Sequence, residues 1–147
     1  MKVLPSTLAL LALAAPPAAA QQHVWQSDLQ VRALSVSGAN GNLTARVVVA
    51  AEQGEAMAAR VEVLLPVGVG IVELAPGCKP GPSAPGVPSL RARVICTIGN
   101  LRPRDVREFR VTTTGVPEGV AARFGAMATS DTPDPNPKNN FAETGGS

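Results

Sequence analysis

Aromatic residues are scarce in this sequence, which has three Phe, one Trp and no Tyr among 147 residues. Alanine and valine must therefore fill much of any core. A sugar-binding face of stacked Trp and Tyr rings is not expected, because the chain has too few of these side chains to build one. An excess of one charge is also lacking, since 13 Lys and Arg stand against 11 Asp and Glu. A near-neutral chain offers no broad electrostatic surface for nucleic acid, so we expect no nucleic-acid partner.

Long apolar runs are absent after residue 20. Lys2 precedes an apolar run over residues 3–15, which is followed by a Pro-Pro pair and by Ala18-Ala19-Ala20, a small-residue pattern typical of signal-peptide cleavage. The run is shorter than the roughly 20 apolar residues that a membrane-spanning helix needs. We therefore predict a cleaved signal peptide, a secreted or periplasmic location, and a mature chain without a transmembrane segment. The predicted parts are the signal peptide (1–20), an N-terminal segment (21–27), one domain (28–143) and a tail (144–147).

Histidine occurs once, at His23, close to the predicted start of the mature chain. A Ser-His-Asp or Cys-His catalytic arrangement would have to use this residue. Chain ends seldom hold a side chain in the rigid setting that catalysis requires. We therefore predict no catalytic residues and no enzyme activity, and keep an extracellular enzyme as an alternative.

Cysteine occurs twice, at Cys78 and Cys96. Their separation is unlike a redox CxxC motif, and no further Cys or His accompanies them as zinc ligands. In an oxidising compartment a pair of this kind usually forms a disulfide bond. We predict a Cys78–Cys96 bridge that fastens a long loop to a core strand.

Apolar and polar residues alternate with a period of two in segments 42–49, 59–65, 91–98, 108–112 and 122–129. Such alternation indicates strands with one face toward the core and one toward water. Segments 29–36 and 69–74 are also predicted as strands, the first with a bulge where its alternation changes phase at Leu34 and the second at a sheet edge. The side chains predicted to face the core are Leu43, Ala45, Val47, Val49, Ala59, Val61, Val63, Leu65, Ala92, Val94, Cys96, Ile98, Phe109, Val111, Ala122, Phe124, Ala126 and Ala128.

Turn-forming Gly, Pro and Asn residues separate these segments, and no segment after residue 22 keeps a helical apolar stripe. Antiparallel strands with one apolar face each bury that face by forming two sheets that pack together. We therefore predict an all-β, immunoglobulin-like β-sandwich of about seven antiparallel strands.

The longest Pro- and Gly-rich segment covers residues 76–88, for which we predict an irregular loop. Long loops on a rigid sandwich often carry recognition. We therefore predict a contact surface from Gly77 to Leu90, with Lys79, Ser83 and Val87 as candidate contact residues.

Oxygen-bearing side chains gather near the C-terminal end, among them Asp131, Asp134 and Asn136. Alternating Asp and Asn residues bind calcium in some loops, but the Gly and closing Glu of an EF-hand are absent here. The same residue types also cap and turn a chain that enters a strand. We predict no metal and no cofactor, and keep a calcium-binding or small-ligand-binding protein as the alternative.

The order of the motifs resembles a known family. Leu65-Pro66-Val67-Gly68-Val69 follows one strand, and Val94-Ile95-Cys96-Thr97-Ile98-Gly99-Asn100-Leu101 forms another. The closing motif is Asp134-Pro135-Asn136-Pro137-Lys138-Asn139-Asn140-Phe141-Ala142. Over about residues 28–143 this pattern resembles the bacterial conserved repeat domain (domain of unknown function 11) of exported and cell-surface proteins. Arg104 departs from it, since the family often has Gly after Pro in this turn.

The resemblance implies an immunoglobulin-like sandwich with no catalytic residues to transfer. Together with the predicted export, it leads us to expect a non-catalytic interaction or structural module of the cell envelope or extracellular space. The expected partner is a protein or a cell-envelope component.

Overall fold

The computed structural model describes residues 25–82 and 92–144. These residues form nine β-strands and one short 3₁₀ helix. No helix in these two ranges has the length and apolar character needed to cross a membrane. The elements are β1 (Asp28–Ala39), β2 (Asn42–Gln53), β3 (Ala56–Leu64), β4 (Ile71–Leu74), β5 (Cys78–Pro80), β6 (Arg93–Leu101), β7 (Val106–Thr114), β8 (Gly125–Thr129), η1 (Pro137–Asn140) and β9 (Phe141–Glu143).

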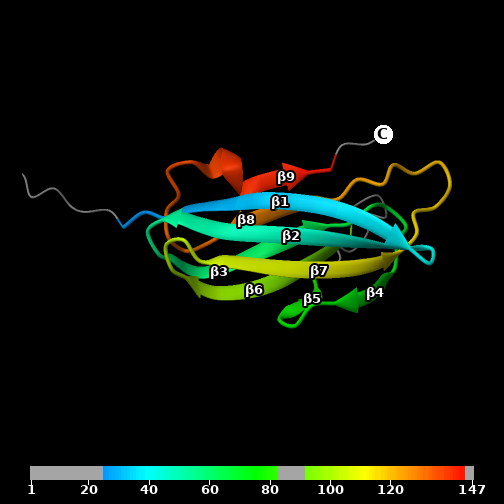
Figure 1. The fold of residues 1–147 in the computed structure, drawn as a ribbon, viewed down its shortest axis with the longest axis horizontal. Coiled ribbons are helices and arrows are strands. Elements are labelled where there is room, and N and C mark those ends of the chain that lie inside the picture. The colour runs from blue at the N-terminus through cyan, green and yellow to red at the C-terminus, as the bar shows by residue number, and fades with distance from the viewer. Residues whose placement is uncertain (1–24, 83–91, 145–147) are drawn as a thin grey trace, which may run out of the picture.

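The strands form two sheets in which every neighbouring pair is antiparallel (Figure 1). Sheet A has the strand order β1-β2-β7-β4, and sheet B has the order β5-β6-β3-β8-β9. The fold is an immunoglobulin-like β-sandwich, which confirms the predicted fold class. The described residues form nine strands rather than about seven. The two additional strands, β5 and β9, are only three residues long, which is too short for an alternating pattern to reveal them.

The core lies between the two sheets and consists mainly of side chains that alternation predicted to face inward, together with Leu29, Ala51, Ala56 and Leu101. Val47 of sheet A and Val61 and Val94 of sheet B are fully inaccessible to solvent. Phe124 is the largest fully buried side chain, whereas the single Trp, Trp25, is 85% exposed. Aliphatic side chains therefore supply most of the buried area, as the scarcity of aromatic residues predicted.

Two residues at strand ends differ from the prediction. Ala92 and Ala122 were expected to face the core, and this is wrong because both are exposed. Strand β6 begins only at Arg93 and strand β8 only at Gly125. Alternation fixes which face a residue takes within a strand, but it does not fix where the strand starts.

The predicted bulge in β1 is confirmed. The register between β1 and β2 shifts between Val31 and Ala33, so Arg32 is the extra residue. One extra residue exchanges the two faces of a strand. Leu34 therefore returns to the core side, opposite Val47.

The turn between β6 and β7 contains Arg104, at a position where the family that the sequence resembles often has Gly. Its φ of 70° lies in the left-handed region that favours Gly. Three backbone hydrogen bonds hold this turn. The Arg104 N–H donates to the Ala51 carbonyl at 2.7 Å, the Ala51 N–H donates to the Asp105 carbonyl at 3.3 Å, and the Asp105 N–H donates to the Arg102 carbonyl at 3.0 Å. The turn therefore keeps a shape suited to Gly although the side chain disfavours it.

We expect Arg104→Gly to raise the free energy of unfolding by about 0.5–1 kcal/mol, since it relieves the left-handed backbone conformation. Arg102→Gly in the same turn is the matched control, because Arg102 does not have a positive φ. Its replacement should lower the free energy of unfolding by a similar amount. Urea unfolding of the two variants measures both effects, and a loss of stability in both would contradict the explanation.

Candidate functional site

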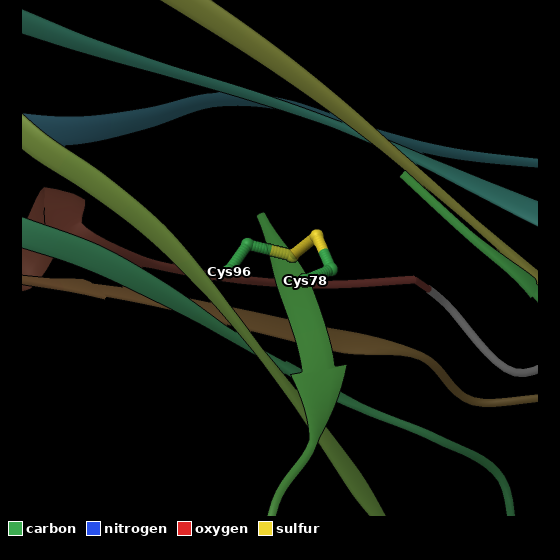
Figure 2. The surroundings of a disulfide bond; sticks show 2 residues. All are labelled: Cys78 and Cys96. Atoms are coloured by element: carbon green, nitrogen blue, oxygen red, sulfur yellow. A yellow bond between two sulfur atoms is a disulfide. The ribbon is translucent and has the colours of Figure 1, made fainter. Parts of the chain in front are cut away.

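The two cysteines are joined, which confirms the predicted bridge. Cys78 on β5 lies directly opposite Cys96 on β6, with the Cα atoms 3.9 Å apart (Figure 2). Backbone hydrogen bonds continue on both sides of the bridge, from the Thr97 N–H to the Gly77 carbonyl at 3.0 Å and from the Gly81 N–H to the Arg93 carbonyl at 2.8 Å. The bond therefore lies within sheet B, where it holds a short edge strand to a core strand. A loop of this size gains about 3 kcal/mol from such a bond in the chain-entropy model.

Of the three candidate contact residues, Lys79 alone lies among the residues that the structure describes. Lys79 is exposed and belongs to β5, so the expectation of an irregular loop throughout 76–88 is wrong at this point. Edge strands tolerate Pro, and Pro80 ends this one. Ser83 and Val87 lie outside the described residues, as do His23 and the predicted signal peptide.

The connection between β4 and β5 joins the two sheets at their open edge. The Ala75 N–H donates to the Arg110 carbonyl of sheet A at 3.0 Å, and the Cys78 N–H donates to the Ala75 carbonyl at 3.1 Å. The bridge to Cys96 then ties Cys78 to sheet B. The segment from Ala75 to Lys79 is therefore held at several points.

A groove of about 550 Å³ runs beside this connection on the outer face of sheet A. Residues 74–76 form one wall. The other lining residues are Thr44 of β2, Glu73 of β4, and Glu108, Arg110 and Thr112 of β7. The sequence showed that the residues from β2 and β7 face outward, but it did not show that they lie together, because that depends on the register of strands far apart in the chain.

The floor of the groove is held by polar contacts. The hydroxyl groups of Thr44 and Thr112 are hydrogen-bonded at 3.0 Å. One oxygen of Glu108 lies 2.6 Å from the Arg46 guanidinium, and the other lies 3.1 Å from the Arg110 guanidinium. The hydrogen bond from Arg46 lowers the pKa of Glu108 below its ordinary value, and Arg110 adds to the effect. The same pairing raises the pKa of Arg46. Glu108 therefore pairs with both arginines, and the three side chains form a surface ion-pair network.

The C-terminal oxygen cluster has a structural role. The Asp134 carboxylate accepts hydrogen bonds from the Leu29 N–H at 2.9 Å and from the Asn136 N–H at 2.7 Å. The Asn139 amide donates to the Asp28 carboxylate at 2.8 Å. These contacts fasten the start of β1 to the segment that enters β9, which agrees with the capping and turning role of such residues.

The three calcium candidates, Asp131, Asp134 and Asn136, differ in exposure and in hydrogen bonding. Asp131 is exposed, and its N–H donates to the Met57 carbonyl at 2.9 Å. Asn136 is exposed and stands before η1. Both oxygens of Asp134 are already engaged by backbone donors. Within residues 25–82 and 92–144, no group of three or more His, Cys, Asp or Glu side chains is placed to hold a metal ion.

No protein family model and no curated protein matches this chain. Among solved structures, ChBD2 from Thermococcus kodakarensis KOD1 is similar at 19% sequence identity with a TM-score of 0.42, over 71% of this chain and 96% of that one. An uncharacterized protein from Nocardia farcinica, described as having an immunoglobulin-like fold, is similar at 13% identity with a TM-score of 0.44, over 84% of this chain and 90% of that one. These identities are too low to transfer a function.

Replacing Asp134 with Ala should lower the free energy of unfolding by about 1–3 kcal/mol, because two backbone donors lose a charged acceptor. The loss should be the same with calcium and with a chelator. Asp131→Ala is the control and should change stability little, since that side chain is exposed. A melting temperature that rises with calcium in the wild type, but not in Asp134→Ala, would instead establish a calcium site.

The Glu108 network predicts a pH dependence. A carboxyl whose pKa is lowered by folding stabilises the protein above its unfolded pKa, and this contribution is lost as the pH falls through its folded pKa. Glu108→Gln should therefore be less stable than the wild type at neutral pH, and the difference should shrink as the pH falls below 4.5. Urea unfolding across this pH range measures the difference. A difference that stays constant with pH would show that the ion pairs contribute nothing.

Proposed function

We propose that the mature protein is an exported, non-catalytic interaction module that binds a protein or cell-envelope component through the segment that begins at Lys79. The observation that carries the proposal is the disulfide bond between β5 and β6. It fixes the base of a Pro- and Gly-rich segment to a core strand of the sandwich. Recognition segments on such folds bind best when their attachment points are preorganised.

The attachment of this segment is firm on both sides. On β5, Cys78 is tied to Cys96, and Pro80 is aligned with Val94. Residues 81–92 then connect β5 to its neighbour β6. Because the two ends of the connection leave adjacent strands, a partner that binds it contacts a segment whose ends are already fixed. Binding then costs less ordering entropy than it would for a free chain end.

Export is supported by two independent features. The apolar N-terminal residues have the pattern of a signal peptide. The disulfide bond is of a kind that persists in oxidising compartments. The resemblance to the bacterial conserved repeat domain agrees with both, and membership of that family is part of the proposal. The residue division into signal peptide, N-terminal segment, domain and tail also belongs to it.

The test is a binding assay with extracts of the native cell envelope. In one variant, residues 83–88 are replaced by alternating Gly and Ser of equal length, which keeps the connection to β6. In the control, residues 116–121 of the loop between β7 and β8 are replaced in the same way. We expect the first variant to lose at least about tenfold in apparent affinity and the control to bind like the wild type.

Lys79→Ala tests the described end of the segment and should weaken binding without changing stability, because its side chain is exposed on an edge strand. Unchanged binding in both Lys79→Ala and the residue 83–88 variant would remove this segment as the contact surface.

A further inference from the structure

The groove on the outer face of sheet A has hydrogen-bonding groups that the fold does not use. The Glu73 carboxylate makes no hydrogen bond or ion pair with the residues described by the structure. The Thr44 and Thr112 hydroxyls share one hydrogen bond, which leaves one O–H donor and several lone pairs free. Arg110 directs its Nε and one terminal nitrogen to Glu108, so its remaining N–H donors are free. The groove therefore contains both hydrogen-bond donors and hydrogen-bond acceptors that are free to bind a ligand.

The charges in and beside the groove cancel. Glu73 and Glu108 carry one negative charge each, and Arg46 and Arg110 carry one positive charge each. A strongly anionic ligand would meet two carboxylates, and a strongly cationic ligand would meet two guanidinium groups. The arrangement favours a ligand without net charge whose groups both donate and accept hydrogen bonds.

The backbone at the Thr44–Thr112 end of the groove disfavours one class of neutral ligand. Here strand β7 is paired with β2 on one side and, over residues 111–113, with β4 on the other, so the backbone N–H and C=O groups of this part of the floor already belong to the sheet. An extended peptide binds well to a sheet by pairing its own backbone with a free edge. Over this part of the floor a peptide would meet side chains only, and its backbone N–H and C=O groups would lose their hydrogen bonds to water without gaining equivalent ones.

The opposite wall supplies aliphatic surface. Residues 74–76 are Leu, Ala and Pro, of which Leu74 and Ala75 are partly buried against the core and Pro76 is exposed. The C–H surface left accessible here, that of Pro76 above all, suits the C–H face of a sugar ring, while the hydroxyl groups of the ring meet Glu73, Arg110 and the two threonines. The volume of about 550 Å³ lies within the range of small-ligand sites.

We propose that this groove binds a neutral carbohydrate chain through hydrogen bonds to Glu73, Arg110 and the Thr44–Thr112 pair. Recognition here rests on hydroxyl groups rather than on aromatic stacking, because none of the described residues that line the groove is aromatic. The affinity for one sugar segment is accordingly weak. The site is separate from the contact segment proposed above and does not depend on it.

The experiment is a two-dimensional amide NMR titration of the mature protein with maltohexaose, cellohexaose and the hexamer of N-acetylglucosamine. We expect at least one of these sugars to shift the amide signals of residues 73–76 and 108–112, and to leave the outer face of sheet B unchanged. Thr112→Val and Glu73→Gln should each weaken binding about tenfold, since each removes a group that bonds a sugar hydroxyl. Thr97→Val, an exposed threonine on β6, is the matched control and should bind like the wild type.

Several outcomes would overturn the proposal. These are the absence of shifts in the groove for all three sugars, equal binding by both groove variants and the wild type, or tighter binding of an uncharged Ser- and Thr-rich peptide than of any sugar. The variant with residues 83–88 replaced separates the two proposals, because it should lose envelope binding and keep the sugar titration. The spectra of Thr112→Val and Glu73→Gln without ligand report whether each variant is folded.

Discussion

The packing of two apolar sheet faces against each other is the interaction on which the other features of this protein depend. Neither sheet can bury its apolar face alone, and with so few aromatic residues the burial comes from many small aliphatic side chains. Each contributes little, so close packing over the whole interface matters more than any single residue. The bulge at Arg32 serves this packing, since without it Leu34 and Val36 would point to water.

Once the interior is formed, the outer faces and edges are free to carry polar chemistry. On sheet A the strand register sets Arg46 opposite Arg110, an arrangement of like charges that would be unfavourable alone. Glu108 forms an ion pair with each of them, which offsets their mutual repulsion. At the open edge the disulfide bond holds β5 in place, although three residues make few contacts of their own. The groove and the proposed contact segment are therefore both positioned by strand pairing within the fold.

The sequence predicts features that depend on local pattern. Alternation indicated the inward positions of β2, β3 and β7, and two lone cysteines allowed a single pairing. Features that depend on register were not predictable, because Thr44 and Thr112 are 68 residues apart and only the pairing of β2 with β7 brings them together. Strand β5 was missed because its Pro and Gly neighbours indicate a loop, and only its position at a sheet edge makes a strand acceptable. The sequence placed Asp134 in a polar cluster, but it could not predict that the Leu29 N–H is a hydrogen-bond partner of this carboxylate.

The contact between Asp134 and Leu29 joins residues that are 105 positions apart. Contacts of such separation form late, because nearly the whole chain must be ordered before the cost of closing so long a loop is recovered. Because the chain is synthesised from its N-terminus, β1 is made long before the residues that fasten it. Until residues 134–139 are made, the start of β1 lacks the hydrogen bonds that fasten it, and the domain acquires its full cooperative stability only when this segment is in place.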